Sequence, residues 1–312
     1  MKFLLSFAFV WFTLMPYHAQ SGKKYQISPA LEQIPLWPHS MPDDDSGSRE
    51  PEKISDKGSV TNVSNPRLIV HQPKNPNGTA ILVISGGGYA HIELGKESTP
   101  AANWFQSEGI TAFELVYRLP QENWKSTNVP FEDAQRAIRI IRSLAKNYSI
   151  DPNKIGILGF SAGGHLAGFA AAKSDENLYT SIDQTDTLSA RPDFVGLIYP
   201  VISMLPPNNK THSYKSILGG SPSTEQEIAY SVEKQVNESM PVTFITQAAD
   251  DPISPVDNSF LIYSALSNVH VPAEMHIFQT GEHGWGLGRK GSPVSSWPGL
   301  FKNWAQHNGF WK

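Results

Sequence analysis

The sequence predicts one α/β domain built on a mostly parallel, doubly wound sheet with helices on both faces. Short apolar runs recur along the chain, and helical segments alternate with them. Such short, almost wholly apolar runs are typical of parallel strands that are buried on both faces. About 290 residues follow the N-terminal segment, and a 39% apolar content with proline- and glycine-rich loops favours one large core over two small domains.

The first 19 residues predict a targeting segment that takes no part in the fold. Lys2 supplies a positive start, residues 3–15 are apolar, and Ala19 is the small residue that a signal peptidase favours. The apolar run is too short for a permanent membrane span. We therefore expect an exported protein, periplasmic or secreted; the alternative is an uncleaved segment that holds the chain at a membrane surface.

Residues 20–57 are polar and proline-bearing, and they predict an extended lead-in to a domain that spans residues 58–312. The one apolar stretch of the lead-in, residues 34–38, is expected to dock onto the core. The domain opens with two expected strands, Arg67–His71 and Ala80–Ile84, joined by an Asn-Pro-Asn-Gly turn. This arrangement predicts a hairpin.

Helices and strands alternate through the rest of the chain. The clearest helix is expected over residues 131–147, where apolar residues recur at three-and-four spacing. Its cationic side chains, Arg136, Arg139, Arg142 and Lys146, are expected to face water. The other expected elements are a helix over 98–107, strands over 111–117 and 155–160, a helix over 162–173, strands over 194–199 and 242–246, a helix near 259–267, a strand over 273–278 and a helix over 297–307.

The clearest candidate catalytic residue is Ser161, which lies in Gly-Phe-Ser-Ala-Gly between an expected strand and an expected helix. A turn from strand to helix at one residue needs a strained backbone, which side chains at Gly159 and Gly163 would obstruct. The turn exposes the hydroxyl at the sheet edge and points the amide of Ala162 to where a substrate oxyanion would lie. The chain has 24 glycines, so the strand–turn–helix setting is stronger evidence for a nucleophile than the five residues alone.

A serine hydroxyl needs a base to take its proton, and the base needs an acid to orient it. His283 follows the last expected strand in a glycine-flanked loop and can reach back over the sheet edge; a solvated loop histidine is the alternative. The acid is Asp250 or Asp251, directly after the strand over 242–246. Asp251 is favoured because the following proline holds it extended, and its neighbour would then cap or brace the loop. The chain order Ser, Asp, His is that of α/β-hydrolases.

Three successive glycines, residues 86–88, follow an early strand and predict the second half of an oxyanion hole. Without side chains, the amides of Gly87 or Gly88 can approach a developing charge together with that of Ala162. A simple tight turn or a phosphate-binding loop is the alternative, but the lysine and hydroxyl pair of a P-loop is missing. His165, four residues after the serine, is expected to pack behind it in the helix, with contact to the substrate as the alternative.

Composition excludes several other classes of function. The chain has 25 basic and 29 acidic residues and no basic stripe, so we expect no nucleic-acid partner. It has no cysteine, which removes disulfides, thiol catalysis and thiolate metal sites. Its ten histidines show neither the H-x-x-x-H nor the H-x-x-E-H spacing, so we expect no zinc site.

These motifs together resemble the α/β-hydrolase esterases of the acetyl xylan esterase and hormone-sensitive-lipase-like type, in particular exported, xylanase-like bacterial carbohydrate esterases. The resemblance covers about residues 34–304. It departs at Ser85, where many relatives carry His or Pro before the three glycines, which leaves the orientation of that loop open. The resemblance rests on the glycine loop, the Ser161 motif, the Asp250–Asp251 loop and the His283 loop. It also rests on Ile-Pro-Leu-Trp-Pro at 34–38, Val-Thr-Asn-Val at 60–63, Tyr-Arg-Leu-Pro at 117–120, Asp-Ala-Gln-Arg-Ala at 133–137 and Tyr-Pro-Val-Ile-Ser-Met at 199–204.

The resemblance implies an α/β-hydrolase fold and hydrolysis of acetyl or similarly small esters on plant or algal polysaccharides, without a cofactor. An acetylated polysaccharide or oligosaccharide is the expected partner. Residues 204–240, rich in Pro, Ser and Asn, predict a partly helical insertion over the active-site face. An aromatic platform for the sugar is expected from Tyr89, Tyr117, Trp124 and Trp285, with ordinary core or rim packing as the alternative for each.

Two other functions stay open at this point. A broad carboxylesterase or lipase would use the same triad, and its preference for acyl chain length would separate it from a carbohydrate esterase. A catalytically silent glycan-binding module would keep the fold without the reaction. The propeller domain of an oligopeptidase does not fit in the length of this chain.

Overall fold

The computed structural model describes residues 24–38, 40–44 and 50–311. The predicted targeting segment, residues 1–19, lies outside these ranges. Within them, none of the helices has the length and apolar character that crossing a membrane requires.

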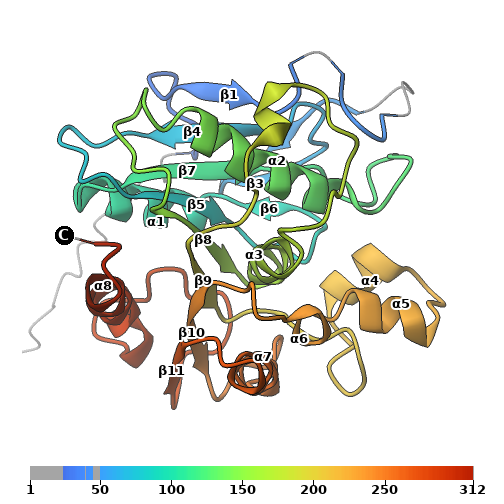
Figure 1. The fold of residues 1–312 in the computed structure, drawn as a ribbon. Coiled ribbons are helices and arrows are strands. Elements are labelled where there is room, and N and C mark those ends of the chain that lie inside the picture. The colour runs from blue at the N-terminus through green and yellow to red at the C-terminus, as the bar shows by residue number, and fades with distance from the viewer. Residues whose placement is uncertain (1–23, 39, 45–49, 312) are drawn as a thin grey trace, which may run out of the picture.

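An eight-stranded sheet runs through the molecule in the spatial order β1-β4-β7-β5-β8-β9-β10-β11 (Figure 1). β1, β4 and β7 pair antiparallel, and every neighbouring pair from β7 to β11 is parallel. The predicted fold class, a mostly parallel doubly wound α/β sheet, is therefore confirmed. The strands are β1 (Gln33–Pro35), β4 (Arg67–His71), β5 (Ala80–Ile84), β7 (Thr111–Val116), β8 (Ile155–Phe160), β9 (Phe194–Ile198), β10 (Val242–Ala248) and β11 (Ala273–Phe278).

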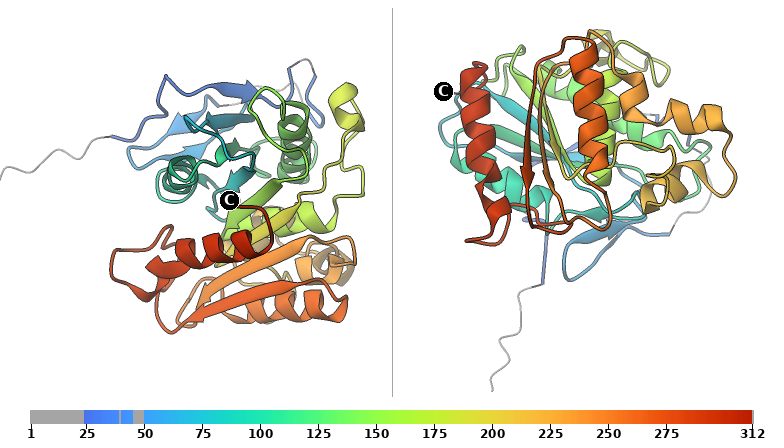
Figure 2. Two further views of the ribbon diagram at one scale, coloured as in Figure 1. Left: turned by 60° about the vertical axis from the view of Figure 1, so that its left-hand side comes forward. Right: turned by 90° about the horizontal axis from the view of Figure 1, so that it is seen from below.

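Helices cover both faces of the sheet. One face packs against α2 (Val129–Ser143), α3 (Ala162–Ala172) and α7 (Asp257–Asn268), and the other against α1 (Ser98–Ser107) and α8 (Trp297–His307). Figure 2 shows α7 and α8 on opposite sides of β10 and β11. The remaining helical segments are α4 (His212–Leu218), α5 (Thr224–Ala229), α6 (Val232–Gln235) and two 3₁₀ turns, Gln184–Thr187 and Pro293–Ser296.

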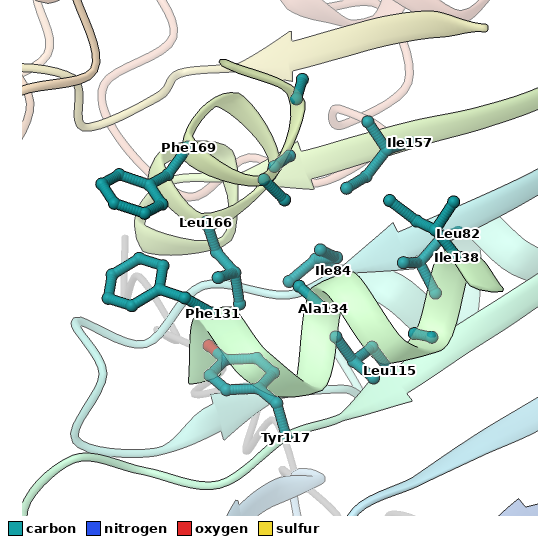
Figure 3. Packing of buried hydrophobic residues seen from close by; sticks show 14 of the residues in the cluster. Leu82, Ile84, Leu115, Tyr117, Phe131, Ala134, Ile138, Ile157, Leu166 and Phe169 are labelled. Carbon is teal, nitrogen blue, oxygen red and sulfur yellow. The ribbon is translucent and has the colours of Figure 1, made fainter. Parts of the chain in front are cut away.

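The larger apolar core lies between the central strands and helices α2 and α3. Leu82, Ile84 and Ile157 from the strands pack with Ala134 and Leu166 from the helices (Figure 3). All of these side chains are fully buried, and each large one contributes about 1.5–3 kcal/mol of hydrophobic stabilisation. Because the strands are covered on both faces, they are apolar at nearly every position rather than at every second one.

The expected hairpin of β4 and β5 does not form. β7 lies between these two strands, antiparallel to β4 and parallel to β5. The Asn-Pro-Asn-Gly segment therefore connects strands that are not neighbours, and Asn77 donates its backbone N–H to the carbonyl of Gly109 just before β7. The hairpin prediction was wrong because a local turn signal does not report which strand enters the gap later in the chain.

The expectation that the α2 arginines face water was also wrong. Arg136 and Arg139 are only 2% and 6% exposed, whereas Lys146, which follows the helix, is exposed. The segment after α3 folds back over them and places Asp183 and Asp186 against the Arg136 guanidinium, at 2.6 and 2.7 Å. A helical face that looks polar in sequence is thus covered by matching carboxylates.

The N-terminal lead-in contributes an edge strand to the main sheet, and residues near the start of the domain contribute to a small second sheet. β1 joins the edge of the main sheet beside β4, and the fully buried Leu36 follows it, as expected of an apolar anchor. A small second sheet of β2 (Lys53–Ile54), β3 (Ser59–Thr61) and β6 (Ile92–Glu93) was not predicted, because strands of two or three residues carry no periodic signal.

Candidate active site

Ser161 lies at the sharp turn between β8 and α3. Its φ of 52° and ψ of −118° belong to a region that residues with a side chain rarely adopt, which is the strain that the motif predicts. A β-carbon at Gly159 would meet the backbone of Gly163, and one at Gly163 would meet the carbonyl of Ile84. Both positions therefore need glycine, and the turn leaves Ser161 on the wall of a cavity.

Two hydrogen bonds connect Ser161 to His283 and Asp251. His283 Nε2 lies 2.8 Å from Ser161 Oγ, and His283 Nδ1 lies 2.7 Å from Asp251 Oδ2. An ionised carboxylate only accepts, so Nδ1 carries the proton and donates to Asp251. Nε2 is then the acceptor for the serine hydroxyl, which is the tautomer that a general base needs.

The two neighbouring aspartates have different partners. Asp251 has a fully buried side chain, and its second oxygen accepts from the N–H groups of Ile253 and Ser254 at 2.8 and 2.9 Å. Asp250 instead accepts from two backbone N–H groups of the loop that carries His283, at 2.9 and 2.8 Å. Asp251 thus bonds to the imidazole, and Asp250 bonds to the loop that carries it.

The glycine loop faces Ser161 across the same cavity. Gly87 and Gly88 line the cavity and have φ values of 119° and 64°, which favour glycine. Among the described residues, no acceptor receives a hydrogen bond from the N–H groups of Gly87, Gly88 or Ala162. The structure thus brings the three predicted amides near the serine and leaves their N–H groups without an acceptor among the described residues.

Ser85, where the sequence departs from the resembling family, holds the glycine loop in place. Its hydroxyl donates to the carbonyl of Glu93 at 3.1 Å and accepts from the N–H of Ser98 at 3.0 Å. Its carbonyl accepts from the Tyr117 hydroxyl at 3.0 Å. Ser85 therefore anchors the glycine loop to β6, to α1 and to Tyr117, the residue after β7.

The cavity beside Ser161 has a volume of about 400 Å³. Its wall combines the glycine loop, the histidine loop and residues 211–213 from the segment that was predicted as an insertion. No cluster of three or more His, Asp or Glu side chains that could hold a metal ion occurs in the described part of the chain. The residues that line the cavity beside Ser161 are Gly87, Gly88, Ala90, His91, Glu93, Lys96, Glu97, Ser161, Val201, Thr211, His212, Ser213, Ile253, His283 and Gly284.

The predicted aromatic platform is not present at this cavity. Tyr89 and Tyr117 are fully buried and pack edge-on with ring centroids 6.2 Å apart. Their hydroxyls bond inside the protein, Tyr89 to His165 Nδ1 at 2.9 Å and Tyr117 to the Ser85 carbonyl. Both rings therefore belong to the core, and the Tyr117 hydroxyl also bonds to Ser85 at the start of the glycine loop.

The two tryptophans of that prediction also lie outside the cavity lining. Trp124 covers the guanidinium of the buried Arg118, 5.1 Å from its ring centroid. Trp285 packs edge-on against Tyr199 at 4.4 Å. The packing alternative given for all four aromatic residues therefore describes them better than the sugar-binding role.

His165 packs behind the serine, as expected. It is fully buried, and its Nε2 donates to the carbonyl of Tyr230 at 2.7 Å while its Nδ1 accepts from the Tyr89 hydroxyl. Burial lowers the pKa of His165 to about 4, so the ring is neutral at neutral pH.

Two further residues lie at the site, Glu97 and Tyr199, and neither was predicted to take part in it. Glu97 accepts from the Gly86 N–H at 2.6 Å and from the Tyr199 hydroxyl at 2.9 Å. No motif or spacing distinguishes Glu97 from a solvated glutamate at the start of a helix, so the sequence carried no signal for it.

The sheet order, the strained serine between strand and helix, and the Ser–Asp–His chain order define an α/β-hydrolase. The BD-FAE family model matches residues 68–266, more than half of the chain. The chain therefore belongs to the BD-FAE family of α/β-hydrolase esterases, which confirms the resemblance seen in its sequence.

Two curated relatives are similar to this chain. It is 38% identical over 207 residues to endo-1,4-beta-xylanase B of Butyrivibrio fibrisolvens and 33% identical over 226 residues to an acetylxylan esterase of Xylanibacter ruminicola. These matches cover 65% and 71% of this chain but only 32% and 44% of the relatives. The chain thus spans less than half of the length of either relative.

Solved structures resemble the chain over most of its length. The acetyl ester-xyloside bifunctional hydrolase of Caldicellulosiruptor lactoaceticus is 35% identical with a TM-score of 0.77, and the match covers 90% of this chain and 97% of that one. The carboxylesterase Cest-2923 of Lactobacillus plantarum, 20% identical with a TM-score of 0.67 over 85% and 99% of the two chains, shares the fold.

Proposed function

We propose that this protein is a serine esterase that removes acetyl or similarly small acyl groups from xylan-type polysaccharides. The observation that carries this proposal is the pair of hydrogen bonds that joins Ser161 to His283 and His283 to Asp251. Relatives named as an acetylxylan esterase and an acetyl ester-xyloside hydrolase support the substrate class.

In the proposed reaction, His283 Nε2 takes the proton of Ser161 as the hydroxyl oxygen attacks the ester carbonyl. Asp251 holds the imidazolium that forms, and the free amides of the glycine loop and Ala162 donate to the oxyanion. The tetrahedral intermediate expels the sugar alkoxide, which takes the proton back from His283 and leaves an acyl-serine. Water, deprotonated by His283, then attacks the acyl carbonyl and releases acetate and the free serine.

The cavity wall supports a small acyl group on a polar leaving group. Ala90, Val201 and Ile253 are its only aliphatic side chains among the described lining residues. His91, Glu93, Lys96 and His212 offer donors and acceptors that suit the hydroxyls of a sugar rather than a long hydrocarbon chain.

The first experiment compares wild type with Ser161→Ala on a chromogenic acetate ester and on acetylated xylan, read by released acetate. The variant should lose turnover by about 10⁴-fold or more while keeping its fold. Full activity of the variant would contradict the assignment, and a wild type that fails to react with a fluorophosphonate probe would favour the silent glycan-binding alternative.

The second comparison sets acetylated xylan against esters of increasing acyl length. We expect the rate to fall steeply beyond short acyl groups, because the cavity offers few aliphatic contacts. Faster hydrolysis of a long-chain ester would replace the carbohydrate esterase by a broad carboxylesterase or lipase. Export to the periplasm or the medium, where polysaccharides are met, remains part of the proposal and rests on residues 1–19 alone.

A further inference from the structure

Glu97 is a carboxylate buried beneath the cavity, with only 4% of its surface exposed. It stands at the start of α1 and lines the cavity floor beside the glycine loop. Removing a carboxylate from water costs free energy unless hydrogen bonds replace the lost solvation. Its hydrogen bonds therefore indicate what this group is for.

One oxygen of Glu97 accepts from the glycine loop, and the other accepts from Tyr199, the residue after β9. Oε2 accepts the Gly86 N–H at 2.6 Å, and Oε1 accepts the Tyr199 hydroxyl at 2.9 Å. The Tyr199 oxygen in turn accepts the Gly286 N–H at 3.0 Å. Burial raises the pKa of Tyr199 well above its ordinary value, so the phenol stays protonated and can donate.

This chain of hydrogen bonds connects two loops that are far apart in sequence. Gly86 directly precedes the two glycines that face Ser161, and Gly286 lies three residues after His283. The Tyr199 ring itself stands edge-on to the imidazole, with centroids 5.0 Å apart. One carboxylate thus fixes the glycine loop and, through Tyr199, the loop of the base.

We propose that Glu97 is a positioning residue that holds the oxyanion amides and His283 in one geometry around Ser161. This inference rests on the proposed function, because it concerns the same reaction. A misplacement of about 1 Å costs up to about 10²-fold in rate, so a shared anchor for both loops affects turnover more than substrate binding.

Glu97 also acts on the charge of the base. Burial raises the pKa of Glu97, and the hydrogen bonds from Gly86 and Tyr199 together with the charge of His283 oppose that rise. The ionised carboxylate attracts the imidazolium that forms when His283 takes the serine proton. Asp251 contacts the same ring directly, so two carboxylates stabilise the imidazolium. The other titratable groups that interact with Glu97 are Tyr117, Tyr199, Glu93 and His91.

The test is Glu97→Gln, with Glu233→Gln as the matched control. Glutamine has one acceptor oxygen, so either the Gly86 N–H or the Tyr199 hydroxyl loses its partner. Glu233 is likewise a buried carboxyl, 9% exposed and bonded to the Ser203 hydroxyl at 3.0 Å, but it lies outside the cavity of Ser161. Rates on a chromogenic acetate ester are measured over pH and normalised by fluorophosphonate titration of active serine.

We expect E97Q to lower kcat about 10- to 100-fold with KM within about twofold of wild type. The acid limb of its kcat/KM profile should move to lower pH, since the imidazolium loses a nearby negative charge. E233Q should stay within about twofold of wild type in kcat, because no catalytic loop depends on it. Tyr199→Phe cuts the connection but keeps the Glu97 charge, so we expect lower kcat with an unmoved acid limb.

The inference is overturned if E97Q keeps the wild-type kcat, or if its loss only matches a lower fraction of folded, titratable enzyme. It is also overturned if E97Q and E233Q lose activity equally. These outcomes differ from failure of the proposed function, in which wild type itself neither hydrolyses the acetate ester nor reacts with the fluorophosphonate.

Discussion

At the level of single residues, Asp250 and Asp251 show that a shift of one position along the chain changes which group a carboxylate contacts. Both follow β10, and both side chains are carboxylates, yet only Asp251 meets the imidazole. Asp250 lies in a turn that is closed by the Asp251 N–H, which donates to the Ala248 carbonyl at 3.3 Å, and the two adjacent side chains leave this turn in different directions. The two groups should therefore separate cleanly in their effect on rate.

We expect Asp251→Asn to lower kcat on an acetate ester by about 10³- to 10⁴-fold, because the amide no longer enforces the Nδ1–H tautomer of His283. Asp250→Asn still offers an oxygen to the two backbone N–H groups it binds, so we expect its kcat within about threefold of wild type. Steady-state kinetics on both variants decides between them. A larger loss in D250N than in D251N would contradict the assignment of the acid.

At the scale of one element, α2 shows that amphipathic spacing does not determine what covers a polar face. Its apolar residues pack on the sheet as predicted, while the opposite side carries Arg136 under the segment that follows α3. The guanidinium bonds to Asp183 and Asp186, and it also donates to the carbonyl of Leu36 at 3.1 Å. Arg136 thus joins α2 to the lead-in and to the segment after α3.

Arg136→Met should lower the free energy of unfolding by about 3–5 kcal/mol, because it leaves the buried carboxylate of Asp186 without its cation. Lys146→Met, at an exposed position just past the same helix, should change it by less than about 0.5 kcal/mol. Urea unfolding at neutral pH measures both. Equal stability of R136M and K146M would show that the ion pair is not a stabilising contact.

At the scale of the whole molecule, His165 joins three separate parts of the chain. It lies on α3, one turn after Ser161, and it bonds to Tyr89 of the glycine loop and to Tyr230 of the segment over 204–240. Its neutral ring accepts one bond and donates the other, whereas a protonated ring would carry two donors and oppose the Tyr89 hydroxyl. Protonation should therefore loosen the contact among these parts.

The pKa of His165 is about 4 in the folded protein against an ordinary value of 6.5, so the unfolded chain binds its proton more readily. The stability that the neutral ring provides is complete above about pH 6.5 and falls as the pH drops towards 4, by about 1.4 kcal/mol per unit.

His165→Gln keeps an acceptor for Tyr89 and a donor for Tyr230 but does not titrate. Between pH 7 and pH 5 the free energy of unfolding of wild type should fall by about 2 kcal/mol more than that of H165Q. Denaturant unfolding of both proteins at the two pH values measures the difference. Parallel pH dependence in the two proteins would refute this role of His165.

Local physics made much of this protein predictable from its sequence. The bounds of α1 and α8 agree with expectation, and those of β8 and β11 do as well, because apolar periodicity and glycine or proline boundaries are short-range signals. The turn at Ser161 was predictable for the same reason, since its steric demand is met by two residues next to it. The domain bounds and the catalytic roles stay predictions until they are measured.

From the sequence alone we predicted the strands of the main sheet from β4 onward, the helices that cover it, and the side chains at the ends of its strands. The packing of distant segments, in contrast, places β7 between β4 and β5, covers Arg136 with carboxylates, and puts Tyr89 and Tyr117 in the core. It alone also placed Glu97 between the glycine loop and, through Tyr199, the loop of His283. The reason is physical: secondary structure depends on neighbours along the chain, whereas burial, strand pairing and hydrogen-bond partners depend on which distant segments pack together.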